Sequence, residues 1–490
     1  MNSLVSKDGF TLRPYQQEFI DTVVTNYPHV ATFDDMGLGK TIQCIAADAY
    51  RRQQAGPGQH KTLVVAPLTG VIDQWVEAFN NWLPELTVRR VNPKKRYLFL
   101  KEEADVYIIH PEGLRLEATA LSGIKWLHFI FDEVHRIKNR NTKTSKAAIT
   151  VGKQARFRTG ATGTPIENRT DELWHILKWL YPDKYSRQSA QFNHWAQKLL
   201  ASYWRFFERY TVYETDEWTG YHTITGTKNA EELRELFGPL YVRRYKQNVA
   251  KELPDKQYQK YYVDLLPKQR KAYNAMRDQL LAWVGEQEDQ PVVAPVVIAQ
   301  LIRLQQFALG YGEISTITKV NVNDGVRKER QEVRFTLSEP SIKLDALMEI
   351  LDDLGDKQAV IFTTSKQAVA LANARFEAAG ISAVTITGDI SDAQRSLNIK
   401  KHQSGEAQVL VATIRAGGVG INLQHCDIMI FLDRDWSPAK NKQAEDRLHR
   451  IGQKNTVHII DIVAHNTIDQ RKDDVLQKKW GWIKETIGAY

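Results

Sequence analysis

The stretch Asp34-Asp35-Met36-Gly37-Leu38-Gly39-Lys40-Thr41 decides how the first part of the chain folds. Residues 30–33 before it are mostly apolar and fit a buried strand, and apolar residues recur at helical spacing through 42–49 after it. A strand, a glycine-containing loop and a helix in this order are the context of a phosphate-binding loop. The sequence therefore indicates a site for a nucleoside triphosphate.

Each residue type in this loop has a physical reason to bind phosphate. Gly37 and Gly39, with Leu38 between them, let consecutive backbone N–H groups curl around the phosphate oxygens. The positive end of the following helix points at the same anion. Lys40 adds a full charge, and the Thr41 hydroxyl is a ligand suited to Mg²⁺. We therefore expect ATP and Mg²⁺ as cofactors.

Asp34 departs from the strict pattern G-x-x-x-x-G-K-[ST], which has glycine at this position. Considered alone, the loop could instead be a glycine-rich helix N-terminus followed by a Lys-Thr pair that occurs by chance. Motifs elsewhere in the sequence distinguish these two interpretations.

Size and composition describe an ordinary globular protein. The chain has 490 residues, which suggests two to four domains, and 42% of them are hydrophobic and 25% charged. No stretch approaches the apolar length that spans a bilayer, and residues 1–8 lack the apolar core of a signal peptide. We expect a cytoplasmic protein (host cytoplasm for a viral source), or a nuclear one for a eukaryotic source, without a membrane partner.

The cysteines and the net charge indicate which kinds of site and partner to expect. The two cysteines, Cys44 and Cys426, are far apart and form no C-x-x-C motif, so neither a zinc site nor a disulfide framework is expected. The formal net charge of +8 and the pI of about 9.1 favour a polyanionic partner.

Two regions, about 10–180 and about 341–470, alternate strand and helix patterns in the manner of parallel α/β sheets. Strands of the first region are predicted at Val30–Phe33, Thr62–Ala66, Val106–His110, Leu127–Phe131 and Arg156–Gly160. Strands of the second region are predicted at Gln358–Thr363, Ala383–Thr387, Gln408–Ala412, Asp427–Leu432 and Val457–Val463. A helix is predicted from Ser365 to Ala379, ending at Gly380.

The middle of the chain, about 181–340, has a different pattern that predicts insertions. Aromatic-rich helical stretches occur from Phe192 to Tyr210. Two polar segments, Thr211–Thr227 and Ile314–Leu337, predict β-hairpins, the second turning at Asn323-Asp324-Gly325.

Asp132 and Glu133 directly follow the apolar strand at Leu127–Phe131. Ligands of open α/β sheets bind at the carboxyl ends of the strands, so this acid pair is expected beside the phosphate-binding loop. We expect Asp132 to hold Mg²⁺ and Glu133 to orient and deprotonate the attacking water. A solvated acidic turn is the alternative.

The Gly/Thr-rich segment Arg158–Pro165 is interpreted as structural.

The second region carries arginines suited to phosphoryl transfer. The spacing of Gln443, Arg447 and Arg450 predicts that all three lie on one face of a helix, after a glycine-rich loop at 413–422. An arginine at a phosphoryl-transfer site stabilises the charge that develops there. The alternative is a surface helix that carries salt bridges.

In its series of motifs the chain resembles the Swi/Snf-type branch of superfamily 2 helicase-like ATPases. The segments that carry the resemblance are 12–16, 34–41, 64–68, 132–139, 162–168, 416–423 and 443–453. They span nearly the whole chain, and the last, which ends His449-Arg450-Ile451-Gly452-Gln453, is highly specific to that branch. Asp34 is usual in this branch, whereas Val134 replaces the usual Ala and Gln424 stands where Thr is common.

The resemblance implies an α/β fold with two RecA-like lobes of the P-loop NTPase type, with helical and hairpin insertions and with ATP between the lobes. We expect an N-terminal lobe at 1–240 with an insertion at about 181–240, and a C-terminal lobe at 241–475 with an insertion at about 277–340. A packing helix is expected at 476–490.

The resemblance also assigns roles to residues. It implies that Gln16 reads the adenine edge, that Gly418 and Gln443 help bind the nucleotide, and that Arg447 and Arg450 contact ATP from the second lobe. Double-stranded DNA would lie across both lobes, with its phosphates contacted by residues in or near the motifs. These candidate DNA contacts are Thr69, Asn168, Lys366 and Arg415.

The leading functional hypothesis is a DNA-dependent ATPase that couples ATP hydrolysis to translocation on double-stranded DNA. The first alternative is a helicase that separates or anneals strands of forked or branched DNA. A non-enzymatic ATP-gated nucleic-acid clamp and an RNA-directed ATPase are further alternatives. We expect a monomeric motor. We also expect a viral or prokaryotic source, because few residues remain outside the motor itself.

Overall fold

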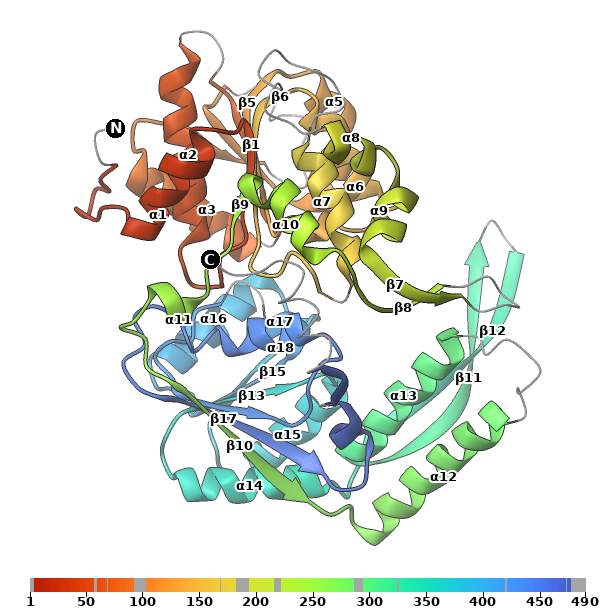
Figure 1. Cartoon of the computed structure of the whole chain (residues 1–490). Helices are drawn as coiled ribbons and strands as arrows, with labels where there is room; N and C mark the ends of the chain where they lie inside the picture. The colour runs from red at the N-terminus through yellow and green to blue at the C-terminus, as the bar shows by residue number, and fades with distance from the viewer. Residues whose placement is uncertain are drawn as a thin grey trace. The chain divides into compact units, whose positions relative to one another are not determined.

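The computed structural model of the chain describes residues 4–56, 60–67, 69–91, 103–167, 169–181, 194–215, 222–285, 294–323, 326–418, 421–472 and 474–476. The chain forms two compact units (Figure 1). Unit 1 comprises mainly Met1–Glu214 and His222–Leu253, and unit 2 comprises mainly Pro254–Lys478. The domain limits inferred from the sequence stay a prediction, and nearly all of the expected helix at 476–490 lies outside the described residues.

The described residues of unit 1 form a seven-stranded sheet in the order β3-β4-β2-β5-β6-β1-β9, in which every neighbouring pair is parallel. The strands are β1 His29–Thr32, β2 Thr62–Val65, β3 Val88–Arg90, β4 Val106–Ile109, β5 Trp126–Asp132, β6 Ala155–Ala161 and β9 Tyr241–Val242. All the strands predicted for this region are confirmed. The short strands β3 and β9, at the two edges of the sheet, were not predicted.

Helices pack on both faces of this sheet, as its apolar strands require (Figure 1). The α-helices are α1 Pro14–Phe19, α2 Lys40–Ala55, α3 Thr69–Trp82, α4 Pro111–Leu116, α5 Ala118–Ser122, α6 Lys143–Gly152, α7 Leu173–Leu180, α8 His194–Ala201, α9 Tyr203–Tyr210, α10 Ala230–Phe237 and α11 Lys246–Val249. A π-helical turn covers Ile20–Val24, and 3-10 turns cover Val134–Ile137, Thr170–Glu172 and Gly238–Leu240.

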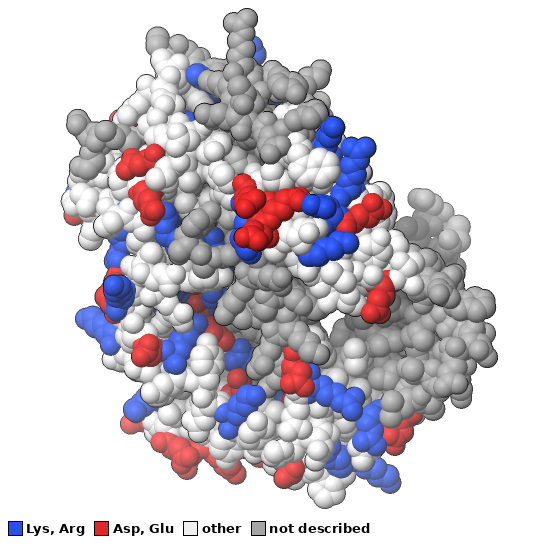
Figure 2. All heavy atoms as spheres, in the orientation of Figure 1, with Lys and Arg blue, Asp and Glu red and all other residues white. Residues whose placement is uncertain are grey.

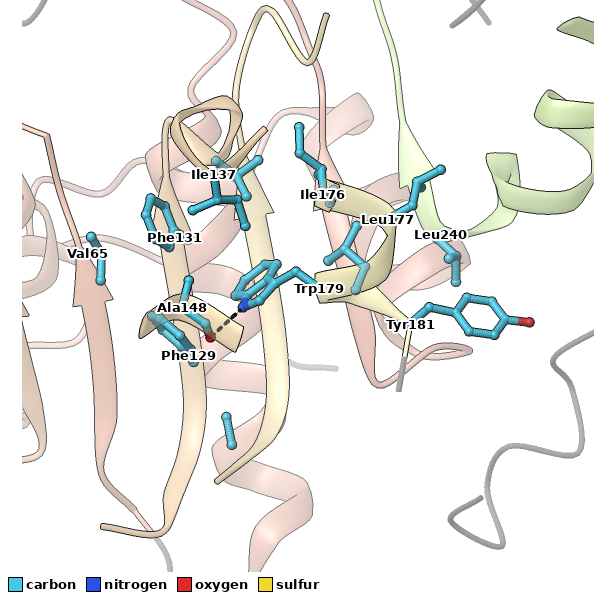
Figure 3. Close-up of a cluster of buried hydrophobic side chains, with 14 of the residues drawn as sticks. Val65, Phe129, Phe131, Ile137, Ala148, Ile176, Leu177, Trp179, Tyr181 and Leu240 are labelled. Carbon is cyan, nitrogen blue, oxygen red and sulfur yellow. Dashed lines mark hydrogen bonds between the residues drawn. The ribbon is translucent and has the colours of Figure 1, made fainter. Parts of the chain in front are cut away.

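Trp179 of α7 anchors the core that supports β5 (Figure 3). Its ring packs edge-on against Phe129 and Phe131 of β5, with distances between ring centroids of 5.4 Å and 6.2 Å. The indole Nε1–H is buried and donates to the Ala148 carbonyl at 3.2 Å, which satisfies the one polar atom of the ring. This packing fixes the strand whose carboxyl end carries Asp132 and Glu133.

The described residues of unit 2 form a six-stranded parallel sheet in the order β10-β17-β16-β13-β15-β14. The strands are β10 Lys256–Val263, β13 Ala359–Thr363, β14 Ala383–Ile386, β15 Val409–Thr413, β16 Ile428–Phe431 and β17 Val457–Ala464. The helices are α12 Pro267–Gly285, α13 Ala294–Leu309, α14 Ile342–Leu354, α15 Lys366–Ala378, α16 Asp392–Gln403, α17 Ile414–Gly417 and α18 Pro438–Glu445. The strands predicted for this region are confirmed, as is the helix that ends before Gly380. Strand β10 was not predicted.

Both faces of the second sheet are buried. Ile361 of β13 belongs to one apolar cluster and Val360, its neighbour in sequence, belongs to another, because successive side chains of a strand point to opposite faces. The predicted α/β class with two parallel-sheet lobes is thereby confirmed.

The described residues of the middle region contain both predicted hairpins as two-stranded sheets. Strands β7 Thr211–Thr215 and β8 His222–Thr227 pair, as do β11 Tyr311–Asn323 and β12 Val326–Ser338. The antiparallel register joins Asn323 to Val326. Residues 324–325 of the predicted turn lie outside the described residues, as do residues 216–221 between β7 and β8.

Candidate nucleotide-binding site

The phosphate-binding loop connects β1 to α2, as the sequence predicts. Gly37 and Gly39 have φ values of 84° and 73°, in the left-handed region that glycine adopts without strain. Gly39 is the N-cap of α2 and Lys40 its first residue, so the unpaired N–H groups of the helix start lie within the loop. Thr41 follows as the second residue of the helix. This geometry provides the ring of N–H donors that a polyphosphate requires.

The Lys40 side chain is held inside the loop. Its ammonium group donates to the carbonyls of Asp34 at 2.9 Å and Asp35 at 3.1 Å. A Cβ on Gly163 would lie 3.4 Å from the Lys40 Nζ and 2.8 Å from the Met36 Cγ, so the loop after β6 closely approaches the phosphate-binding loop. Burial lowers the pKa of Lys40, although the nearby carboxylates, Glu133 foremost, act in the opposite direction.

Gln16 and Tyr15 of α1 support the same loop. The Gln16 amide donates to the Leu38 carbonyl at 3.2 Å and accepts from the Arg13 N–H at 2.9 Å, and the Tyr15 hydroxyl donates to Leu38 at 3.1 Å. A Cβ on Gly39 would lie 2.5 Å from the Gln16 Nε2, so glycine is required there for space as well as for backbone conformation. The structure thus brings Gln16 to the loop, and its reading of adenine stays a prediction.

Asp132 is the last residue of β5, and its carboxylate is bound on both oxygens. The indole N–H of Trp75 in α3 donates to one oxygen at 2.9 Å, and the Glu133 N–H donates to the other at 2.9 Å. Burial raises the pKa of Asp132, and the charge of Glu133 raises it further. A hard cation beside the carboxylate would favour its ionised form.

Glu133 takes the left-handed conformation, with φ of 53°, and its side chain contacts the loop after β6. Its Oε2 accepts from the Thr162 hydroxyl at 3.0 Å and lies 3.1 Å from the His135 Nδ1. Burial alone raises the pKa of Glu133, but the hydrogen bond and charge of His135 and the charge of Lys40 outweigh burial and lower it. Glu133 is therefore an ionised carboxylate at neutral pH, as a general base must be.

Sequence reasoning missed several residues that contact this site. Thr162 belongs to the segment interpreted as structural, yet it binds Glu133 and lies 2.8 Å from the His135 Nδ1. Trp75 and His135 were not assigned either. The signal for Thr162 was its position directly after a strand that neighbours β5 in the sheet, where strand ends converge.

In unit 2 the expected helix that carries both arginines is not confirmed. Helix α18 ends at Glu445, so Gln443 lies in its last turn while Arg447 and Arg450 lie in the irregular turn that follows. The physical reason is that tertiary contacts replace helical bonds: the Arg447 carbonyl accepts from the Leu423 N–H at 3.1 Å, and Gly452 has a φ of 102°.

The remaining nucleotide candidates of unit 2 lie near this turn. The Arg447 side chain donates to the Gln443 carbonyl at 3.2 Å and to the Ile421 carbonyl at 3.4 Å. Gly418 directly follows α17 as its C-cap, and a Cβ at this position would lie 2.5 Å from the Ile414 carbonyl oxygen. Burial lowers the pKa of Arg450. That these residues and Lys40 contact one phosphate stays a prediction.

The candidate DNA contacts are distributed over both units. Thr69 is the first residue of α3, Arg415 is exposed on α17, and Lys366, the first residue of α15, pairs with Asp389 at 2.6 Å on the surface. Asn168 lies outside the described residues. In the view of Figure 2, acidic and basic side chains of the described residues occur side by side on the surface.

The described residues carry neither a metal-binding cluster nor a membrane-spanning helix. They contain no cluster of three or more His, Cys, Asp and Glu side chains arranged to hold a metal ion. None of their helices combines the length and apolar character that crossing a bilayer requires.

Thr41 and Asp132 supply the hydroxyl and carboxylate oxygens that Mg²⁺ takes alongside substrate phosphates, so the donor set fits that ion.

Comparisons with known proteins identify the family. A sequence profile described as SNF2-related domain matches residues 18–308, and one described as Helicase conserved C-terminal domain matches residues 342–452. An uncharacterized ATP-dependent helicase of Mycoplasma pneumoniae is 28% identical over 99% of this chain and 43% of its own length. The transcription regulatory protein SNF2 of Saccharomyces cerevisiae is 28% identical over 94% of this chain and 27% of its own length.

Among solved structures, the Sulfolobus solfataricus SWI2/SNF2 ATPase core in complex with dsDNA aligns with 98% of this chain and 97% of its own, at 25% identity and a TM-score of 0.42. The chain spans less than half the length of the two curated relatives named above. Because the SNF2-related profile alone covers more than half of its residues, the chain belongs to the SNF2-related family.

Proposed function

We propose that this chain is a DNA-dependent ATPase that uses ATP hydrolysis to move along double-stranded DNA. The observation that supports hydrolysis most strongly is the network at the carboxyl ends of β5 and β6. There an ionised Glu133 is fixed by Thr162 and His135, next in sequence to an Asp132 that suits a metal ion. A nucleotide clamp without catalysis has no need of a general base fixed in this way.

The chemistry follows from the residues of the loop and the acid pair. The N–H groups of 37–41 and the Lys40 ammonium bind the phosphates, and Thr41 and Asp132 hold Mg²⁺. When bound, Mg²⁺ supplies positive charge at the phosphate oxygens. Glu133 orients a water molecule and accepts its proton, and burial of the site strengthens each of these interactions.

The second unit supplies the remaining residues of the proposed site. Arg447 and Arg450 contact the terminal phosphate and stabilise the charge that develops on it, while Gly418, Gln443 and Gln16 help bind the nucleotide. Binding of ATP then draws the units together, and hydrolysis removes the link. If the units contact the DNA backbone alternately, each cycle moves the protein along it.

DNA as the partner is supported by the basic net charge of +8 and by the name of a 29% identical relative from Mus musculus, the chromodomain-helicase-DNA-binding protein 1-like. Thr69, Asn168, Lys366 and Arg415 are the proposed phosphate contacts. The protein is proposed to act as a monomer, in the cytoplasm or, in a eukaryote, in the nucleus.

A panel of ATPase assays tests the proposal. Hydrolysis is measured with duplex DNA, single-stranded DNA and RNA at several salt concentrations. We expect the largest stimulation with duplex DNA, weakening as salt rises because phosphate contacts release counterions. Equal stimulation by RNA would exclude the proposed specificity.

The two hairpins, β7–β8 and β11–β12, favour one second candidate, a helicase that separates or anneals the strands of forked or branched DNA. A hairpin can act as a wedge between strands. Displacement of a third strand from a triplex without separation of a forked duplex supports translocation, and separation of the fork supports the helicase.

A further inference from the structure

The phosphate-binding loop is tied to a segment that lies far from it in sequence. Asp34 is fully buried, and one of its oxygens accepts from the Arg244 N–H at 2.8 Å. The other accepts from the Arg244 guanidinium at 3.1 Å and from the Gln43 amide at 2.8 Å. All three of these groups are donors, so both oxygens of the Asp34 carboxylate are hydrogen-bonded within unit 1. Asp34 therefore fixes the position of the loop.

The same segment holds the loop through Arg243 and its own main chain. The buried Arg243 guanidinium donates to the Gly163 carbonyl at 2.8 Å and lies 3.5 Å from the Asp35 carboxylate. The Asp35 N–H donates to the Arg244 carbonyl at 2.9 Å, and the Lys246 N–H donates to the Asp35 carboxylate at 3.2 Å. Arg243 thus links the phosphate-binding loop to the loop after β6.

A few residues further on, the chain contacts the arginine-bearing turn of unit 2. The Pro254 carbonyl lies 2.7 Å from the His449 Nε2, and the Lys256 ammonium lies 3.0 Å from the Glu445 carboxylate. The Tyr258 hydroxyl donates to the same carboxylate at 2.8 Å. Glu445 is the last residue of α18, directly before the turn that carries Arg447 and Arg450.

We propose that residues 241–258, here named the coupling segment, position both halves of the nucleotide site. Arg244 acts on the phosphate-binding loop through Asp34, and Lys256 acts on the arginine turn through Glu445. This inference rests on the proposed function, since it assigns positioning residues to that same site. The chain that joins the two units is thereby attached at each end to an element that binds the nucleotide.

The physical basis is the cost of leaving a buried charge without its partner. Without the Arg244 side chain, Asp34 keeps the Gln43 amide and the main-chain N–H of residue 244 but loses its ion-pair partner, so the loop must rearrange to expose the carboxylate or neutralise it. Rearrangement moves the N–H groups that bind phosphate. Nucleotide affinity must then fall even where the unit stays folded.

A double-mutant cycle at the first end tests the proposal. The three variants are Arg244→Met, Asp34→Gly and the double variant that carries both changes. Asp34→Gly restores the common glycine of the motif. Binding of a fluorescent ADP analogue and the midpoint of thermal unfolding are measured for each. We expect each single change to weaken binding by about tenfold or more, the scale found for supporting partners of a site, and the double variant to be no weaker than the worse single variant.

The control is Arg209→Met, which breaks the pair with Glu232 elsewhere in unit 1 and leaves nucleotide affinity unchanged. Arg244→Lys, which keeps the charge but loses the forked geometry, should recover part of the affinity. Affinity within about twofold of the parent in Arg244→Met, or effects that multiply in the double variant, would overturn the proposal.

The second end is tested by Lys256→Met, with Arg375→Met, which loses the pairs with Glu339 and Asp345, as the control in unit 2. We expect Lys256→Met to lower kcat about tenfold with unchanged affinity for the ADP analogue, because the affected arginines act on hydrolysis. An unchanged kcat overturns this half of the proposal. Absence of turnover in the parent protein would instead contradict the proposed function, and the binding cycle would still decide the role of Arg244.

Discussion

The Thr162 hydroxyl lies 3.0 Å from the Glu133 carboxylate, and this contact connects the ends of two neighbouring strands, β6 and β5. Glu133 has a left-handed backbone that few residues other than glycine adopt, so the surrounding contacts must hold it there. His135 contacts both side chains. A displacement of the loop after β6 therefore changes the position of the proposed base.

Replacement of Glu133 by Gln should abolish most turnover. Gln keeps the size of the side chain but removes the negative charge that accepts the proton, so kcat should fall about 10²–10⁴-fold while nucleotide affinity stays near that of the parent. Steady-state ATP hydrolysis and binding of a fluorescent nucleotide measure the two quantities. A Gln variant with the parent kcat would show that Glu133 is not the base.

Thr162→Ala should lower kcat about tenfold or somewhat more, since a hydrogen bond to a charged group contributes about 1.5–3 kcal/mol. Thr162→Ser, which keeps the hydroxyl, is the matched control and should retain most of the activity. Hydrolysis by both variants is compared at saturating ATP. If Ala and Ser behave alike, the hydroxyl has no part in holding Glu133.

Trp75→Phe should make Mg²⁺ activation more sensitive to acid. The indole N–H stabilises the ionised form of Asp132, so its loss raises the pKa of that carboxyl further above its usual range. Protons then compete more strongly with the metal, and the Mg²⁺ concentration for half-maximal activity should rise more at pH 6 than at pH 8. An equal rise at both pH values would contradict the link through Asp132.

Asp48 should be a strong determinant of the stability of unit 1. Its buried carboxylate accepts from Arg52 and from Thr62, each at 2.7 Å, and lies 3.0 Å from the His128 Nδ1. Asp48→Asn should lower the free energy of unfolding by about 3–5 kcal/mol, because it breaks a buried ion pair. Asp73→Asn, which affects an exposed pair with Arg90, should change it by about 0–1 kcal/mol.

The pH dependence of this difference has a definite sign. Burial raises the pKa of Asp48, but the hydrogen bond from His128 and the charge of Arg52 outweigh burial and lower it. When the pKa of a carboxyl is lower in the folded protein than in the unfolded chain, the carboxyl stabilises the fold at pH values above its unfolded pKa of about 3.9. This stabilisation is lost as the pH falls through the folded-state pKa. Denaturant titrations should therefore show a constant gap between parent and Asp48→Asn at pH 6–8. A gap that widens in acid would contradict the assignment.

Local pattern predicted most of the fold. The apolar strands at 127–131 and 359–363 were identified because a strand buried on both faces has a continuous apolar run. Strand β9 has two residues, and β10 is largely exposed and polar, so neither has such a run. The phosphate-binding loop and the acid pair were found for the same reason, since each follows directly on a buried strand.

Contacts between distant residues set the limit of sequence reasoning. The helical spacing of 443–450 predicted one helix, but α18 ends where Lys256 and Arg434 bind the Glu445 side chain. Arg244 binds Asp34 across 210 positions, and no local pattern reports such a pair. Trp75 was missed for the same reason, because its partner Asp132 lies 57 positions away.

The most direct measurement is ATP hydrolysis with saturating duplex DNA by the parent protein, by Lys40→Ala and by the double variant Arg447→Ala with Arg450→Ala, alongside duplex binding by each. We expect both variants to bind the duplex and to lose about 10³-fold or more of the DNA-stimulated rate, because the proposed mechanism requires charge from both units at one phosphate. DNA-stimulated hydrolysis that persists in Lys40→Ala would contradict the site.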